Sequence, residues 1–252
     1  CKNPNTKLWK IAMWGGMNDW NLLNKLWENN ETFETYLKKN SFEYGSGLHP
    51  KENETNKVLI EGQHIDTSKI KRYYNHKENS KYISKEFRNN NLKLFEKPLA
   101  IIKEGITNKG IVSGFFDYDI YYNKAVYGFA SPDKEKTKSI SIIFNSDLAK
   151  YYFFLTSSSW GIERDRIVLT EYLKFPYLEL LESENIQFEK TNFEESVNLI
   201  NQENQHFDKN VWEKKIAELY QLTKDNLVLI NDTLELSIDL FYKQEKSLAL
   251  KP

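Results

Sequence analysis

The sequence predicts an α+β fold, in which a mixed or antiparallel sheet is flanked by helices at both ends of the chain. Three observations lead to this prediction. Helical periodicity dominates the first 45 residues, short apolar runs and alternation dominate the middle, and helical periodicity returns near the C-terminus. We therefore expect a helical segment at residues 1–45, a sheet-containing domain at residues 57–178 and a second helical segment at residues 185–252.

The first segment is expected to form short helices with a break between them. Two glycines after Trp14 interrupt the pattern, and Asn18 or Asp19 then predicts the N-cap of a helix. A second short helix is expected at residues 31–39. The four tryptophans in this region are expected in a core or a domain seam rather than on a stacking platform. Residues 45–56 are polar and predict a loop that forms the first domain boundary.

The middle of the chain predicts strands. Residues 58–60 and 99–102 are apolar runs of buried-strand length, and alternation over residues 112–122 predicts one long strand. A further strand at residues 125–130 follows a hairpin turn at Asn123 and Lys124. Residues 66–91, rich in Lys, Arg, Tyr and Asn, form a polar insertion that is either a mobile loop or a surface that meets a ligand.

Residues 145–176 are the stretch around which we expect the rest to be organised. Asn145 or Ser146 predicts the N-cap of a helix with apolar residues at helical spacing. After residue 156 three serines, Trp160 and a glycine follow, and then Arg164 and Arg166 with one residue between them. Hydroxyls, an indole and two guanidiniums on one exposed loop suit an anionic polymer. The alternative is a capped core helix followed by a solvated turn.

The C-terminal part predicts two antiparallel helices joined at residues 221–223. Asp208 is a candidate cap for the first helix, and Thr223 for the second. We expect these helices to pack on each other or on another domain.

Charge and cysteine content narrow the classes of protein. The net charge is −1, but the charges are unevenly distributed. Residues 60–139 hold 15 basic and 10 acidic side chains, whereas residues 176–252 hold 8 basic and 15 acidic ones. This distribution fits a binding module followed by a solvated helical segment. Cys1 is the single cysteine, which excludes a disulfide framework within the chain and favours a reducing, cytoplasmic location. No apolar run reaches the ~20 residues of a membrane span. A chain that opens with Cys1 suggests a fragment of a longer protein.

The search for catalytic motifs is mostly negative. Glycine-rich phosphate-binding patterns are absent, and the four histidines lack metal-ligand spacing. Asp117 and Asp119 could hold a magnesium ion, which leaves a metal-dependent nuclease or hydrolase as an alternative. The serines at 157–159 have no local base to activate them.

Four motifs in order resemble the adenine-specific N6 DNA methyltransferases of restriction–modification systems. Residues 145–176, with an Asn-Ser-x-Leu helix, Tyr-Tyr, a serine-rich turn, Arg and Phe-Pro, resemble their target recognition region. Lys-Ile-Ala-Met-Trp-Gly at residues 10–15 resembles the segment after their catalytic domain. Glu-Gly-Gln-His-Ile at residues 61–65 resembles the entry to their recognition domain, and residues 217–223 resemble a C-terminal helix end.

The resemblance implies that residues 57–178 select the DNA sequence presented to a methyltransferase domain upstream. The family's Asn/Asp-Pro-Pro-Tyr/Phe loop and glycine-rich cofactor loop do not occur in this chain. We therefore expect no catalytic residue, metal or cofactor here, and S-adenosylmethionine in the catalytic domain of the parent protein. Double-stranded DNA and that linked domain are the expected partners, with no membrane. Besides the metal-dependent enzyme, an interaction scaffold docked through the C-terminal helices stays open.

The expected DNA contacts follow from the chemistry of the duplex. Lys and Arg neutralise phosphates, and Arg can pair bidentately with a base edge. Tyr73, Tyr74 and Trp160 could stack on or wedge beside a flipped base. The candidate DNA-binding residues are Lys69, Lys71, Arg72, Lys103, Lys109, Ser157, Ser158, Ser159, Trp160, Arg164 and Arg166.

Overall fold

A computed structural model describes residues 6–47, 58–60, 92–106, 110–117, 119–162, 164–180 and 209–245 of the chain. Its elements, in chain order, are α1 (Thr6–Trp14), α2 (Met17–Asn29), α3 (Phe33–Lys39), β1 (Glu43–Ser46), β2 (Val58–Ile60), η2 (Leu92–Phe95), β3 (Leu99–Lys103), β4 (Ser113–Phe116), β5 (Ile120–Tyr122), β6 (Val126–Ala130), α4 (Lys134–Phe144), α5 (Asp147–Thr156), α6 (Leu169–Tyr172), α8 (Lys209–Leu219), α9 (Lys224–Asp232), η4 (Thr233–Ser237) and α10 (Ile238–Glu245).

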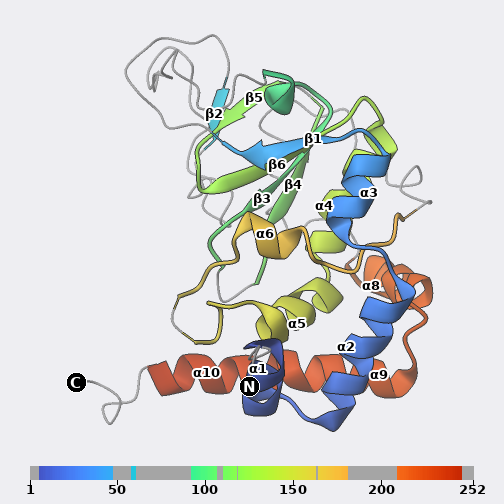
Figure 1. The fold of residues 1–252 in the computed structure, drawn as a ribbon, viewed down its shortest axis with the longest axis vertical. Helices are drawn as coiled ribbons and strands as arrows, with labels where there is room; N and C mark the ends of the chain where they lie inside the picture. The colour runs from blue at the N-terminus through green and yellow to red at the C-terminus, as the bar shows by residue number, and fades with distance from the viewer. Residues whose placement is uncertain are drawn as a thin grey trace.

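The predicted α+β class is confirmed. Four strands form an antiparallel sheet in the order β1-β6-β3-β4, and β2 and β5 form a separate parallel pair. Helix α4 packs against β3 and β4, and α5 lies beyond it, between the sheet and the α9–α10 rod (Figure 1). The sheet therefore occupies one end of the molecule with α3, α4 and α6 beside it, and α1, α2, α8, α9 and α10 lie toward the other end (Figure 1).

Strand β1 corrects the start of the polar loop predicted at residues 45–56. Residues 45 and 46 were expected in a polar loop, but they pair with β6, in the register Gly45 opposite Gly128. Strand β6 lies about 85 residues further along the chain, and such distant pairing leaves no local pattern that favours a strand over a loop. The N-terminal segment therefore contributes an edge strand to the sheet.

The predicted long strand over residues 112–122 is wrong, because the chain breaks it into β4 and β5. Asp117 pairs with Lys134 at the start of α4, and the Asp119 carboxylate accepts the Lys97 N–H at 3.1 Å. Both contacts lie at the break between β4 and β5. The predicted hairpin is also wrong. A turn does form, with the Val126 N–H donating to the Asn123 carbonyl at 3.0 Å, but β6 pairs with β1 and β3 rather than with β5.

Helix α5 is the buried centre of the helical layer. Its buried side chains occupy every side of the helix, as expected of one enclosed by protein. The predicted cap at Ser146 is confirmed, because its Oγ accepts the Ala149 N–H at 3.1 Å. Asn145 ends α4 instead. Its side-chain amide accepts the Ser113 N–H at 2.9 Å and donates to the Ser113 carbonyl at 2.8 Å, and so joins the helices to β4.

Helix α2 begins two residues earlier than the predicted caps. Gly16 occupies the N-cap position, and Asp19 is the third residue of the helix, where its carboxylate accepts the Gly16 N–H at 2.7 Å. The same carboxylate is buried and accepts the Tyr151 hydroxyl of α5 at 2.9 Å. A residue expected to be a helix cap therefore also joins α2 to α5.

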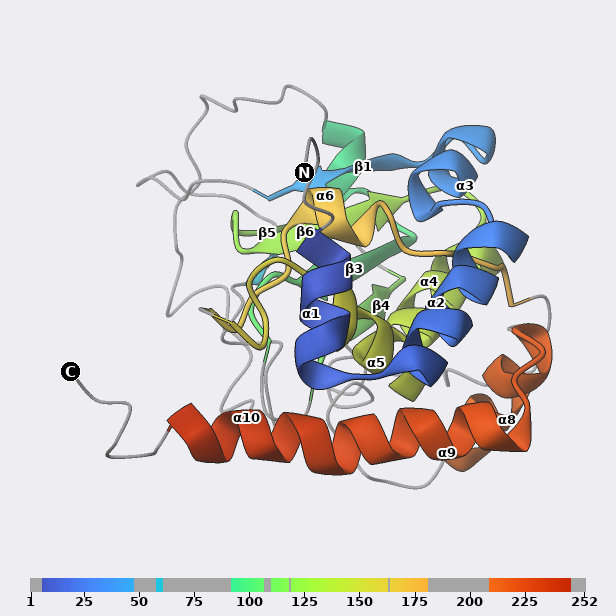
Figure 2. The same cartoon turned by 60° about the horizontal axis from the view of Figure 1, so that its bottom comes forward.

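The C-terminal helices run on into one rod. The Thr223 cap is confirmed by its Oγ1, which accepts the Asn226 N–H at 3.2 Å. Helices α9 and α10 continue through the π-helical segment η4 and lie across one side of the molecule (Figure 2). The predicted cap at Asp208 lies outside the described residues.

One hydrophobic core runs through all three predicted segments. It contains Leu23 and Phe33 from the first, Phe129 from the second, and Trp212 and Ile230 from the third. Among the helices that the structure describes, none has the length and apolarity of a bilayer crossing.

The contact between Gly128 and Tyr122 predicts a sharp difference between two paired glycines. A Cβ on Gly128 would lie 1.8 Å from the Tyr122 hydroxyl, which donates to the Leu94 carbonyl at 2.9 Å. We expect Gly128→Ala to lower the free energy of unfolding by roughly 1–3 kcal/mol, because buried Tyr122 must move. Gly45→Ala is the matched control, with Leu94 at 3.4 Å, and should change stability by less than about 0.5 kcal/mol. Equal urea midpoints for both variants would contradict this packing.

Candidate nucleic-acid interface

The end of β3 and the loop after α5 meet side by side. A β-bridge joins Gly105 to Arg166, the Ile106 N–H donates to the Asp165 carbonyl at 2.8 Å, and the Ile167 N–H donates to the Glu104 carbonyl at 2.9 Å. These bonds bring together two segments that lie about 60 residues apart in the sequence. They bear three of the predicted DNA-binding residues.

Those three residues are Lys103, Arg164 and Arg166, which we call the cation cluster. Lys103 ends β3, and its Cε lies 3.3 Å from the position of a Cβ on Gly105, the bridge partner of Arg166. Arg164 is exposed and Arg166 is half-buried. Lys103 was expected opposite the two arginines, and the bridge between Gly105 and Arg166 brings the chain segment just after Lys103 beside the loop that carries them.

Carboxylates lie among these cations. Glu104 Oε1 lies 3.6 Å from Arg166 Nη1, with the Arg166 side chain 42% exposed and that of Glu104 24% exposed. Burial, and next the negative charge of Glu104, raise the pKa of the Tyr127 hydroxyl. An ion pair this exposed contributes about 0–1 kcal/mol, so Arg166 can exchange Glu104 for another anion at little cost.

Trp160 and Ser157 need correction as DNA contacts. Trp160 is 0% exposed, packs edge-on against Phe154 at 5.3 Å between ring centroids, and donates from Nε1 to the Tyr242 hydroxyl at 3.3 Å. Ser157 is buried, and both its carbonyl and its hydroxyl accept from Lys10. Both residues are buried beneath the loop surface, where neither can reach a base. Their residue types suit either role, so the sequence could not separate them.

Ser158 and Ser159 lie nearer the surface. Ser158 is exposed, and its N–H donates to Glu171 Oε1 at 2.5 Å. The Ser159 carbonyl accepts from Ile162 at 3.1 Å and from Arg164 at 3.3 Å. Gly161, between Ser159 and Ile162, has φ +78°, a conformation that favours glycine. The loop is therefore a tight, internally bonded turn that presents Arg164 at its surface.

The other predicted DNA-binding residues lie outside the described residues. These are Lys69, Lys71, Arg72 and Lys109, together with the aromatic candidates Tyr73 and Tyr74. Their placement relative to the cation cluster stays a prediction.

Lys10 is an important residue that the sequence reasoning missed. It is 1% exposed, and its ammonium donates to the Ser157 carbonyl at 2.8 Å and to the Ser157 hydroxyl at 3.1 Å. Burial lowers the pKa of Lys10 from 10.5 to about 7, and the negative charge of Glu171 partly opposes this shift. One signal could have found it, because Lys10 is the single charged residue in the otherwise apolar run from Leu8 to Trp14.

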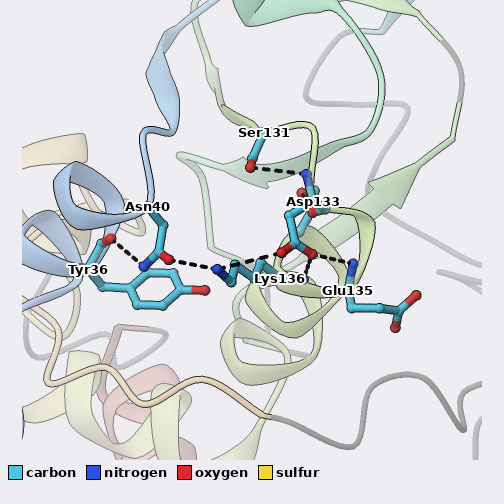
Figure 3. Close-up of polar contacts among 7 residues, drawn as sticks. Tyr36, Asn40, Ser131, Asp133, Glu135 and Lys136 are labelled. Carbon is cyan, nitrogen blue, oxygen red and sulfur yellow. Dashed lines mark hydrogen bonds and ion pairs between the residues drawn. The ribbon is translucent and has the colours of Figure 1, made fainter.

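A second polar cluster, between α3 and α4, has contacts that serve the fold. Lys136 Nζ donates to Asn40 Oδ1 at 2.8 Å, and Asn40 Nδ2 donates to the Tyr36 carbonyl at 3.0 Å (Figure 3). Asp133 Oδ1 accepts the N–H groups of Glu135 and Lys136, both at 3.1 Å. The cluster caps the C-terminus of α3 and the N-terminus of α4. The positive charge of Lys136 lies at the C-terminus of α3 and the negative charge of Asp133 at the N-terminus of α4, as the helix dipoles favour.

The two carboxylates considered for a metal-dependent enzyme already have partners within the protein. Asp117 pairs with Lys134, and Asp119 accepts the Lys97 N–H. Across the described ranges, no group of three or more His, Cys, Asp or Glu side chains is arranged to hold a metal ion. The geometry at Asp117 and Asp119 therefore gives the metal-dependent alternative no support.

Comparisons with protein-family models and with curated proteins find no match to this chain.

The buried ammonium of Lys10 predicts a specific dependence of stability on pH. Between about pH 7 and 10.5 the unfolded chain holds the Lys10 proton and the folded chain does not, so folding stability due to Lys10 rises with pH. We expect the difference in free energy of unfolding, wild type minus Lys10→Met, to rise by up to about 1.4 kcal/mol per pH unit in this window. Urea unfolding at several pH values measures it, and a difference that stays flat would contradict the burial of this charge.

Proposed function

We propose that this chain is the target recognition part of an adenine-specific N6 DNA methyltransferase of a restriction–modification system. It binds duplex DNA and selects the sequence, while a linked domain with S-adenosylmethionine carries out the methyl transfer. The resemblance of the four ordered motifs supports the family. The observation on which the DNA-binding role depends is the bridge between Gly105 and Arg166, which joins the segment after Lys103 to the loop that carries Arg164 and Arg166.

The chemistry of this cluster suits a phosphate backbone. Arg164 is exposed on a turn with fixed backbone hydrogen bonds, so little backbone entropy of the loop remains to be lost on binding. Arg166 exchanges a weak pair with Glu104 for a phosphate or a guanine edge. Glu104 and Asp165 keep the net local charge small, which limits binding to unrelated anions and favours a specific fit.

The salt dependence of DNA binding tests this assignment. We expect the affinity for duplex DNA, measured by fluorescence anisotropy between about 50 and 200 mM salt, to fall steeply and linearly in a log–log plot. Each of Lys103→Gln, Arg164→Gln and Arg166→Gln should reduce the slope by about 0.9 if its cation contacts one phosphate. Lys38→Gln on α3, at the opposite edge of Figure 1 from the loop, should leave the slope unchanged.

Sequence selectivity tests the recognition role separately. Selection from a pool of random duplexes should enrich one site that contains adenine, and the enriched site should bind more tightly than its scrambled version by at least about 10³-fold. Binding without enrichment would reduce the proposal to non-specific DNA affinity. No binding at low salt would contradict it entirely.

An interaction scaffold is the second candidate, because the C-terminal rod exposes apolar side chains. Val228 is 60% exposed, Leu236 66% and Leu240 49%. A scaffold would show no steep salt dependence with duplex DNA. The same titration therefore separates the two functions.

A further inference from the structure

The loop that carries Arg164 and Arg166 is attached to α1 by two side chains of that helix. Lys10 and Trp14 lie four residues apart and so share one face of α1. Lys10 donates to Ser157, and Trp14 Nε1 donates to the Gly161 carbonyl at 3.0 Å. Helix α1 therefore holds both the start of the loop and its glycine turn.

The same two side chains pack on the aromatic cluster beneath the loop. The Lys10 ammonium lies 5.7 Å from the centroid of the Phe154 ring, and Trp14 packs against Phe154 at 5.7 Å and against Phe241 of α10 at 5.8 Å. Ser237 Oγ donates to the Trp14 carbonyl at 3.1 Å. The end of α1 is thus itself fixed by the C-terminal rod.

Glu171 of α6 holds the two ends of the loop together from the other side. Its carboxylate accepts the Ser158 N–H through Oε1 and the Val168 N–H at 3.3 Å through Oε2. One side chain thereby joins residues 158 and 168, which enclose Arg164 and Arg166. Lys10 and Glu171 therefore hold two neighbouring residues, Ser157 and Ser158.

We infer that Lys10 and Trp14 are positioning residues for the DNA-binding loop, and that they set the orientation of Arg164 and Arg166 without touching DNA. Lys10 is buried beneath the loop, where a phosphate cannot reach it. Lys10 supplies the hydrogen-bond donor that the buried Ser157 carbonyl, at the start of the loop, would otherwise lack. The effect of Lys10 and Trp14 on DNA affinity rests on the proposed DNA-binding function. Their effect on the loop is a property of the free protein and is tested without DNA.

Two variants of the full chain test the inference, with one matched control. Lys10→Met keeps the length of the side chain without its donors, and Trp14→Phe keeps an aromatic ring without the indole N–H. Lys25→Met is the control, since Lys25 also donates to a main-chain carbonyl, that of Gln221, at 2.7 Å on another part of the molecule.

The first readout is hydrogen exchange in the free protein. The amides of Ile162, Arg164 and Ile167 all donate within the loop or to Glu104. We expect Lys10→Met and Trp14→Phe to speed their exchange at least about tenfold, the factor that corresponds to about 1.4 kcal/mol. Exchange in β3 should stay unchanged, which shows that the fold is intact, and Lys25→Met should change neither. Unchanged exchange at the three loop amides would overturn the inference.

The second readout is DNA affinity against salt concentration. Both variants should weaken duplex binding roughly tenfold at every salt concentration and leave the slope unchanged, because no phosphate contact is lost. A slope reduced by about 0.9 in Lys10→Met but not in Trp14→Phe would overturn the positioning role, since it would show direct phosphate contact by Lys10. If the wild-type protein binds no duplex while the loop amides still exchange faster in both variants, the DNA-binding function fails and the control of the loop by α1 stands.

Discussion

The burial of α5 on every side is the constraint on which the rest of the structure depends. A helix with apolar and aromatic residues all around it must be covered all around, and α1, α4 and α9 supply that cover. Its polar groups are satisfied internally, as where Tyr151 donates to Asp19 and Trp27 donates to the Tyr152 hydroxyl at 3.0 Å. The N-terminal and C-terminal helices are therefore parts of one core with the sheet.

This arrangement fixes where the chain emerges after α5. Ser157 and Trp160, just beyond the helix, stay in the core. The Ser157 carbonyl accepts from Lys10, and the Trp160 indole N–H donates to the Tyr242 hydroxyl. The chain then reaches the surface beside the end of β3, where Gly105 and Arg166 form their bridge. The candidate interface is thus a hydrogen-bonded turn on a packed base, an arrangement in which the loop backbone loses little entropy on binding.

Local signals explain which features the sequence could predict. The caps at Ser146 and Thr223 and the strand at 99–102 depend on neighbouring residues, and all three are found. The pairing of β1 with β6, and the break between β4 and β5, depend on partners far along the chain. Trp160 and Lys10 show the same limit at the site. An indole suits a stacking surface or a core equally, and the apolar run around Lys10 indicates burial but does not identify its acceptor at residue 157.

The central claim is that the turn between Gly161 and Arg166 contacts duplex DNA. Ile162 is 49% exposed on that turn, and Cys1 is the single native cysteine, so a fluorophore can be attached at Ile162→Cys in a Cys1→Ser background. Addition of duplex DNA should change the emission of this label in a saturable and salt-sensitive manner, whereas a label at Lys38→Cys should respond little. Binding of duplex DNA that leaves the Ile162 label unchanged would contradict the account.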